Sequence, residues 1–392
     1  MRQSRKKWER RRELHRNKLA AVIFVIMMIA FCVVNLATGD REFSATENRA
    51  LEQRPELTIS GLESGRWMEQ YESYVSDQFA GRDFWVVLKS RVDLLAGKRK
   101  ANGVFKGKDH YLLEDIAKPD EDQLKENLSA MKKFQKQYKD IPMYMMLVPN
   151  AANIESDKLP GYAVTENQEK QFKAIHSTLG SAYTWVDVSD ILKKHRSEEI
   201  YYHTDHHWTT LGAYYGYQAL SKSMKLDTSK TSDMKPYAVT NAFNGTLAST
   251  SGYETGYEEP IYIYAPDNLK NATEAVVNNV NEKKKTATLY DTSKLKGKDK
   301  YALFLGGNYP ILDIKTTADS TDRLLIIKDS YANSLIPFLI PYYREIVVVD
   351  PRYYYDDIEK VMKKDNITSV LFLYNGNTFV KDNSISGVLQ ND

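Results

Sequence analysis

Residues 323–334 read RLLIIKDSYANS, and they join a short apolar run to a second structural element. The run 323–328 is predicted to be a strand, because its four central residues are apolar. A helix is expected to follow, from about Ala332 to Ile340. A strand that leads directly into a helix is typical of folds built on a parallel sheet.

The same alternation extends along the chain in both directions. Further strands are predicted at 141–148, 183–188, 345–349 and 369–374, and helices at 66–96, 121–138, 168–179, 210–224 and 358–364. This order predicts an α/β domain with a mostly parallel, doubly wound sheet flanked by helices. Residues 228–300 depart from it, because they are rich in Thr, Ser, Asn, Lys and Tyr and contain short fragments that alternate with period two, such as 260–265. They are predicted to form a β-rich insertion.

The N-terminus has the pattern of a membrane anchor. Residues 1–18 carry nine Lys or Arg and two Glu, and the next nineteen residues, Leu19 to Ala37, contain no charge. Such a run spans about 28 Å as a helix, close to the hydrocarbon thickness of a bilayer. The basic cluster predicts a cytoplasmic N-terminus. We therefore expect a tail at 1–18, an uncleaved single-pass transmembrane signal-anchor at 19–38, a linker at 39–65 and an extracellular domain at 66–392.

Charge and cysteine content restrict the function of the outer part. The tail contributes +7 of formal charge and the whole chain has +2, so the remainder is net acidic. An acidic domain does not have the basic surface that nucleic-acid binding requires. The lone Cys32 lies within the apolar run, so the outer domain is expected to have no disulfide.

Residues 201–210, YYHTDHHWTT, hold three of the seven histidines beside an aspartate. Asp205 and His207 are two residues apart, which places both side chains on one side of an extended loop. Ser330 stands at the expected junction of strand and helix, where unpaired backbone N–H groups can stabilise an oxyanion. A serine requires a base, and an imidazole requires a carboxylate to hold its tautomer. These residues predict a triad of Ser330, His207 and Asp205.

Three alternatives remain open from the residues alone. The histidines of residues 201–210 can simply be polar surface residues. Ser330 is also a good helix N-cap, a role that needs no catalysis. His203, Asp205, His206 and His207 form a set of ligand types that suits zinc or iron. No second cluster of His or Cys completes such a site, so no metal and no cofactor is the favoured expectation.

The two segments together resemble a known family. Thr-Asp-His-His-Trp at 204–208 and Asp-Ser-Tyr at 329–331 resemble the motifs of the DHHW family, which is related to the alginate O-acetylation proteins of the SGNH-hydrolase-like superfamily. The resemblance implies an SGNH-hydrolase-like fold in which Asp205 is the acid, His207 the base and Ser330 the nucleophile. Lys328 departs from that superfamily, where a glycine often precedes Asp-Ser. Weaker likenesses occur at 47–49, 102–107, 243–247, 305–310 and 349–353.

Residues that stabilise an oxyanion or contact substrate are less clearly marked. Gly306, Gly307 and Asn308 are candidates, because their loop follows an apolar run, and a plain glycine-rich turn fits them equally well. Tyr331, next to the serine, is a further candidate.

The expected function is acyl-ester chemistry outside the cell, as an O-acetyltransferase that acts on a secreted or cell-wall polysaccharide. If water accepts the acyl group, the same site is a carbohydrate O-acetylesterase. A non-catalytic glycan-binding or assembly subunit is a further alternative. The resemblance also implies a multi-pass membrane O-acyltransferase as the partner that supplies the acyl group.

Overall fold

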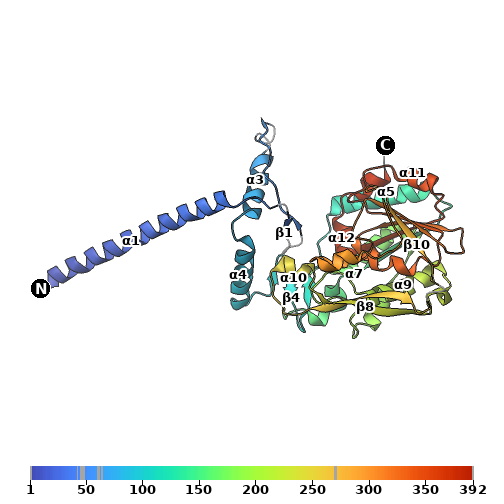
Figure 1. The fold of residues 1–392 in the computed structure, drawn as a ribbon, viewed down its shortest axis with the longest axis horizontal. Helices are drawn as coiled ribbons and strands as arrows, with labels where there is room; N and C mark the ends of the chain where they lie inside the picture. The colour runs from blue at the N-terminus through green and yellow to red at the C-terminus, as the bar shows by residue number, and fades with distance from the viewer. Residues whose placement is uncertain are drawn as a thin grey trace. The chain divides into compact units, whose positions relative to one another are not determined.

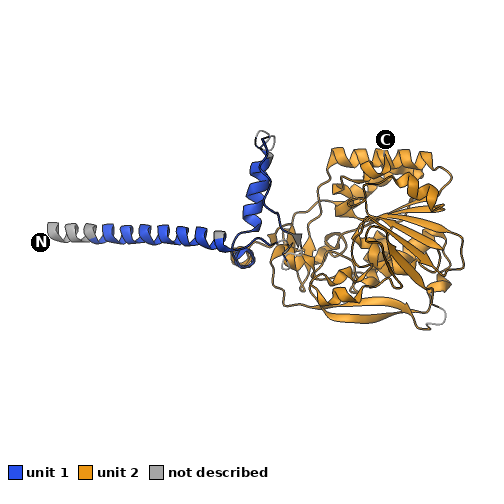
Figure 2. Cartoon of the chain, turned by 45° about the horizontal axis from the view of Figure 1, so that its top comes forward, with its two compact units in different colours: residues 1–89 blue, residues 90–392 orange. Residues whose placement is uncertain are grey.

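The computed structural model describes residues 2–41, 43–44, 49–59, 62, 65–268 and 272–390. The chain divides into two compact units, residues 1–89 and 90–392 (Figure 2). Parts of the linker predicted at 39–65, including residues 47 and 48 of one weak motif, lie outside the described residues.

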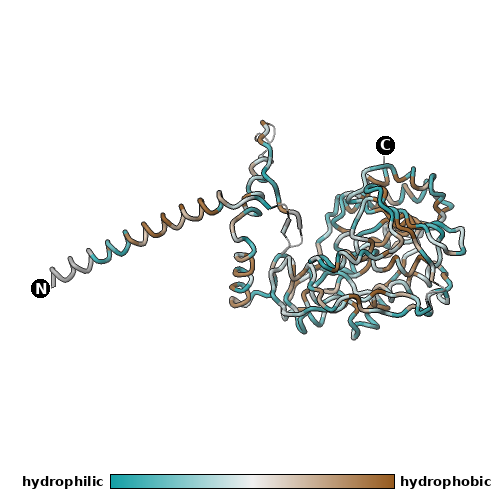
Figure 3. The backbone as a smooth tube through the Cα atoms, in the orientation of Figure 1, coloured by the Kyte–Doolittle hydropathy of each residue, from teal (hydrophilic) through white to brown (hydrophobic). Residues whose placement is uncertain are grey.

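The first unit consists mainly of three helices, α1 (Arg2–Ala37), α3 (Arg66–Asp77) and α4 (Arg82–Leu95), with β1 (Phe43–Ser44) paired to β2 (Arg49–Ala50). Over Arg12–Asn35, α1 is long and apolar enough to cross a membrane, and within the described residues no other helix is (Figure 3). The helical pattern predicted at 66–96 is present as two helices. They are separated by a turn in which Gly81 has a φ of +68°.

The second unit is built on an eight-stranded sheet in the order β11-β10-β12-β14-β13-β15-β6-β7. Figure 1 labels β10 of this sheet and several of the helices of the unit. The strands β14, β13, β15, β6 and β7 are parallel, whereas β12, β10 and β11 join the β14 edge antiparallel. The predicted mostly parallel α/β fold is thereby confirmed. The bounds are β6 Met143–Val148, β7 Thr184–Trp185, β10 Ala275–Asn279, β11 Lys284–Thr286, β12 Ile311–Thr316, β13 Arg323–Lys328, β14 Glu345–Val349 and β15 Ser369–Asn375.

Helices cover both faces of this sheet. Along β13, Ile326 belongs to the core that α9 covers, whereas Leu325 and Ile327 belong to the core beneath α5, α7 and α11. A strand that is buried on both faces has apolar residues at successive positions, as 323–328 does. The helices are α5 Glu121–Gln137, α6 Ala151–Ile154, α7 Gln168–Leu179, α8 Ser189–Lys194, α9 Thr210–Met224, α10 Thr246–Ser251, α11 Ile358–Lys364, α12 Gly376–Lys381 and α13 Ile385–Leu389.

Two local expectations change. The helix predicted from Ala332 to Ile340 is wrong in type, because the segment forms two short 3₁₀ helices, Ser330–Ser334 and Ile336–Phe338. Pro337 has no N–H, so an α-helical hydrogen-bond ladder cannot continue through it. The region 228–300 is β-rich as predicted. Its β8 (Met234–Phe243) and β9 (Glu259–Pro266) form an antiparallel hairpin, but β10 and β11 belong to the central sheet.

Candidate active site

Ser330 lies directly beyond β13, in the middle of the parallel part of the sheet. Asp329 caps the turn that begins there: its Oδ1 accepts a hydrogen bond from the Tyr331 N–H at 2.9 Å. Its Oδ2 accepts one from the Asn375 N–H at 2.8 Å. The alternative in which Ser330 is the cap is therefore wrong. The Ser330 hydroxyl lies instead 2.7 Å from Nε2 of His207.

His207 joins Ser330 to a buried carboxylate. Nδ1 of His207 lies 2.5 Å from Oδ1 of Asp205, which also accepts the His207 backbone N–H at 3.0 Å. Oδ2 of Asp205 accepts hydrogen bonds from both the N–H and the hydroxyl of Thr246, each at 2.8 Å. Burial alone would raise the pKa of Asp205, but the adjacent histidines and these donors hold that pKa well below its ordinary value. Asp205 is therefore an anion.

The N-terminal end of α10 lies against the carboxylate of Asp205. A Cβ added to Gly245 would lie 2.3 Å from Cβ of Asp205 and 2.5 Å from its Oδ2. Only glycine permits this close approach. The approach brings the N–H and the hydroxyl of Thr246 within hydrogen-bonding distance of the Asp205 carboxylate. The segment 243–247, noted in the sequence only as a family likeness, thus has a structural role.

Tyr301 supports His207 from the side. The two rings stack with centroids 3.7 Å apart and an interplanar angle of 11°. The Tyr301 hydroxyl donates to the Ser330 carbonyl at 3.3 Å and to Oγ of Ser334 at 3.1 Å. The tyrosine therefore contacts His207 and holds the serine turn. Nothing in the sequence distinguishes Tyr301 from the other 26 tyrosines.

Two further side chains join the histidine loop to the serine turn, which are more than 120 residues apart in the sequence. Nε1 of Trp208 donates to the Tyr331 carbonyl at 3.0 Å and to Ser334 at 3.1 Å. The Tyr331 hydroxyl donates in return to the His206 carbonyl. The carbonyl and the hydroxyl of Tyr331 thus hold the two segments together, and its N–H is bonded to Asp329.

The other histidines have different partners. Nδ1 of His206 lies 2.7 Å from the Thr246 hydroxyl, and Nδ1 of His203 lies 3.2 Å from Glu259. Ligand atoms of Asp205, His206 and His207 lie within 4.8 Å of one another, and in the described part of the chain His203 is not among them. The atoms of Asp205 and His207 that face each other are already hydrogen-bonded. Three of the four residues of the alternative metal site therefore lie together, whereas His203 is paired with Glu259 instead.

The glycine-rich loop is linked to the serine turn through two side chains. Oδ1 of Asn308 accepts hydrogen bonds from Nζ of Lys328 at 2.8 Å and from Nδ2 of Asn333 at 3.2 Å. Gly306 and Gly307 have positive φ values of 81° and 121°, which favour glycine. Burial lowers the pKa of Lys328 to about 8. The roles of Gly306, Gly307 and Asn308 toward an oxyanion stay predictions.

A cavity of about 490 Å³ adjoins the histidine loop. Its lining includes polar residues from several segments: Asn102, Glu114, His206, Thr246, Asn377 and Thr378. Burial raises the pKa of Glu114, whose carboxylate accepts hydrogen bonds from Asn150 and Asn377. Groups of this kind can bind a ligand that is rich in hydroxyls. His206 and Thr246, which contact Asp205 or each other, line this cavity, but Ser330, His207 and Asp205 do not.

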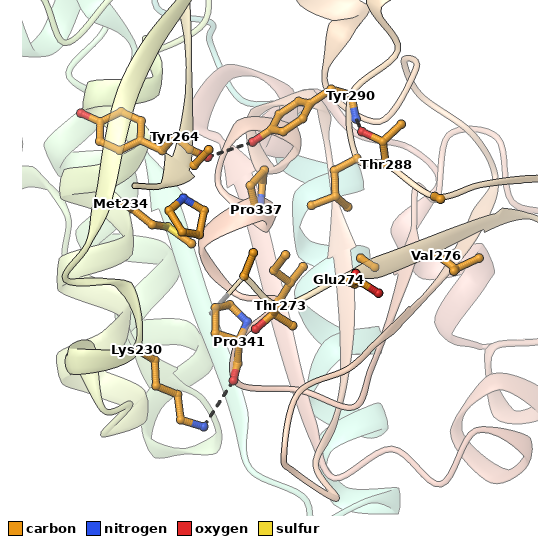
Figure 4. Close-up of a pocket in the computed structure, with 17 residues that line it drawn as sticks. Lys230, Met234, Tyr264, Thr273, Glu274, Val276, Thr288, Tyr290, Pro337 and Pro341 are labelled. Atoms are coloured by element: carbon orange, nitrogen blue, oxygen red, sulfur yellow. Dashed lines mark hydrogen bonds between the residues drawn. The ribbon is translucent and has the colours of Figure 1, made fainter. Parts of the chain in front are cut away.

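A second cavity, of about 500 Å³, lies between the β8–β9 hairpin and β10 (Figure 4). Tyr264, Tyr290, Pro337 and other mainly apolar residues line it, and none of Ser330, His207 and Asp205 does. It is therefore separate from the hydrogen-bonded site.

Comparison with known proteins identifies the family of the chain. The family model of the DHHW protein matches residues 126–349, more than half of the chain, and the match includes both motif segments. The chain belongs to the DHHW family. No curated protein matches this DHHW chain in sequence.

Solved structures share its fold. The crystal structure of a DHHW family protein from Eubacterium siraeum is 25% identical and covers 75% of this chain and 98% of that one, with a TM-score of 0.62. Bacillus cereus PatB1 is 21% identical and covers 73% of this chain and 99% of its own, with a TM-score of 0.60. Another structure of PatB1 carries a sulfonyl adduct.

Proposed function

We propose that this DHHW protein is a serine acyl-ester enzyme, an O-acetyltransferase that acts on a secreted or cell-wall polysaccharide. One observation carries the proposal: a continuous series of hydrogen bonds runs from Ser330 through His207 to Asp205. The family resemblance is the reason for naming acetyl as the acyl group and a polysaccharide as the molecule that accepts it.

In the first half-reaction Ser330 attacks the acyl carbonyl of a donor ester. Nε2 of His207 takes the hydroxyl proton as the Oγ–carbon bond forms, and Asp205 stabilises the imidazolium through Nδ1. The tetrahedral intermediate then expels the alkoxide of the donor, which takes the proton from His207. The product is an acyl ester on Ser330.

In the second half-reaction a hydroxyl of the acceptor loses its proton to His207 and attacks the acyl-serine. Ser330 leaves with that proton, and the acyl group is now on the acceptor. A sugar hydroxyl gives transfer, whereas water gives hydrolysis and an esterase. The cavity beside His206 is the candidate site for the sugar, because Glu114, Asn377 and Thr378 in its lining can bind hydroxyl groups.

The N-terminal helix supports placement at the membrane. We infer that residues 19–38, most of which belong to α1, cross the membrane once, with the basic residues 1–18 in the cytoplasm and the catalytic unit outside the cell. There it would receive acyl groups from a multi-pass membrane O-acyltransferase, the partner that the resemblance implies.

The test uses the whole chain in detergent with a chromogenic acetyl ester. We expect wild-type protein to release the chromophore and to gain the mass of one acetyl group, and the Ser330→Ala and His207→Ala variants to do neither. Turnover that is unchanged in Ser330→Ala would refute serine catalysis and favour the non-catalytic subunit. Transfer to an added oligosaccharide rather than to water separates the transferase from the esterase.

A further inference from the structure

Helix α4 carries large apolar side chains on its solvent-facing side. Phe84, Trp85 and Leu88 are 63%, 42% and 38% exposed. Along the same helix Val92 and Leu95 continue the spacing of three and four, and they are also exposed. A contiguous apolar stripe of this size normally faces a membrane or another protein.

The start of this stripe contacts the helix that is predicted to cross the membrane. The ring of Phe31 in α1 lies 5.8 Å from the ring of Phe79 and 6.0 Å from that of Trp85. Oδ1 of Asn35 accepts a hydrogen bond from the Ala80 N–H at 2.8 Å. The turn between α3 and α4 is therefore seated on the last two turns of α1.

Polar bonds just beyond α1 hold the same arrangement. The Tyr74 hydroxyl donates to Asp40 at 3.0 Å. Gln78 and the Arg41 backbone exchange two hydrogen bonds of 2.9 Å, and the Arg41 guanidinium lies 3.2 Å from Asp83. The apolar contacts of Phe31 and the polar and charged contacts of Asp40 and Arg41 thus follow each other along the chain, as expected at a membrane–water boundary.

The position of Phe31 sets the depth. Phe31 precedes Ala37, the last residue of α1, by six positions, which is about 9 Å along a helix. A ring in contact with Phe31 therefore lies in the outer half of the hydrocarbon layer, about 9 Å from its edge. Interfacial helices insert their apolar face to a similar depth, about 5–10 Å.

We propose that α4 is an interfacial helix whose Phe84–Trp85–Leu88 face lies in the lipid bilayer that α1 crosses. This inference rests on the membrane anchoring proposed above. The second compact unit begins at residue 90, on the same helix. The occupant is the bilayer, because the stripe is continuous with the surface of α1 that lipid surrounds.

The test measures the environment of single nitroxide labels on the whole chain, reconstituted in vesicles of phosphatidylcholine and phosphatidylglycerol. Native Cys32 carries the label in one sample. In a Cys32→Ala background, Phe84→Cys, Leu88→Cys and Tyr162→Cys carry it in turn. Tyr162 is fully exposed on the catalytic unit and serves as the water reference. Collision with oxygen reports lipid, and collision with a water-soluble nickel chelate reports solvent.

We expect labels at 84 and 88 to collide with oxygen, as the label at Cys32 does, and to be shielded from nickel at least several-fold relative to 162. If Cys32 reports lipid while 84 and 88 match 162, the interfacial helix is wrong and the anchor stands. Shielding of 84 and 88 from both reagents would place a protein on the stripe and also overturn the proposal. A water signal at Cys32 itself would refute the anchoring, and with it this inference.

Discussion

Replacing Gly245 with alanine tests whether the position of Asp205 matters for activity. The change adds one methyl group at the point where the backbone of α10 meets the acid. Gly245 has a φ of −87°, a conformation that alanine adopts without strain. The effect of Gly245→Ala must therefore come from contact alone.

The structure gives the size of that contact. The new Cβ would lie 2.3 Å from Cβ of Asp205, whereas carbon atoms normally approach to about 3.5–4.0 Å. Asp205 or the start of α10 must therefore move by about 1 Å or more. A shift of that size in a catalytic group lowers rates by about 100-fold, and overpacking of a buried site costs about 1–3 kcal/mol of stability.

The assay is acetyl-ester turnover, with thermal unfolding measured on the same samples. Gly387→Ala is the matched control, since it adds a methyl group to a glycine with no atom within 4 Å. We expect Gly387→Ala to retain wild-type turnover and Gly245→Ala to lose about two orders of magnitude while it remains folded. Wild-type turnover in a folded Gly245→Ala protein would show that catalysis does not depend on the position of Asp205.

Four further predictions follow from the same contacts. Tyr301→Phe keeps the ring against His207 and should lose less than about 10-fold in turnover, whereas Tyr301→Ala should lose about 100-fold; equal losses would refute the stacking role. Asp205→Asn should lower the free energy of unfolding, measured with urea, by about 2 kcal/mol at neutral pH. Because the folded pKa of Asp205 is depressed, this difference between the variant and the wild type should shrink as the pH falls below about 4. Burial raises the pKa of Glu155 to about 7, so the folded state loses stability as the pH rises from about 4 to 7. Glu155→Gln should therefore be as stable as the wild type at pH 4 and more stable at pH 8, by on the order of 1–2 kcal/mol. A chelator should leave turnover unchanged; a loss restored by zinc would favour a metal site instead.

The arrangement of the sheet follows from the sequence where apolar runs are long and flanked by helices. The strands predicted at 141–148, 323–328, 345–349 and 369–374 are all present. They could be predicted because a strand that is buried on both faces has apolar side chains at successive positions. Strand β12 was not predicted, since Asp313 and Lys315 interrupt its pattern and its antiparallel pairing to β14 is a long-range contact. The 3₁₀ turns after Ser330 were missed because helical periodicity does not distinguish them from an α-helix.

The candidate site was accessible from the sequence only in part. Two short motifs indicated Ser330, His207 and Asp205, which the structure brings within hydrogen-bonding distance. The residues that hold this triad in place could not be predicted from the sequence. Gly245 and Tyr301 act through close approach and ring stacking across the fold, and neither kind of contact leaves a periodic pattern.

The most direct test of the central claim is covalent labelling of Ser330 by phenylmethylsulfonyl fluoride, located by peptide mass. A serine without an activating base reacts negligibly with this reagent. We expect wild-type protein to carry one sulfonyl group on the peptide that contains Ser330, His207→Ala to react at least about 100-fold more slowly, and Ser330→Ala to remain unlabelled. Folded wild-type protein that stays unlabelled, or that labels equally fast without His207, would contradict the proposed triad.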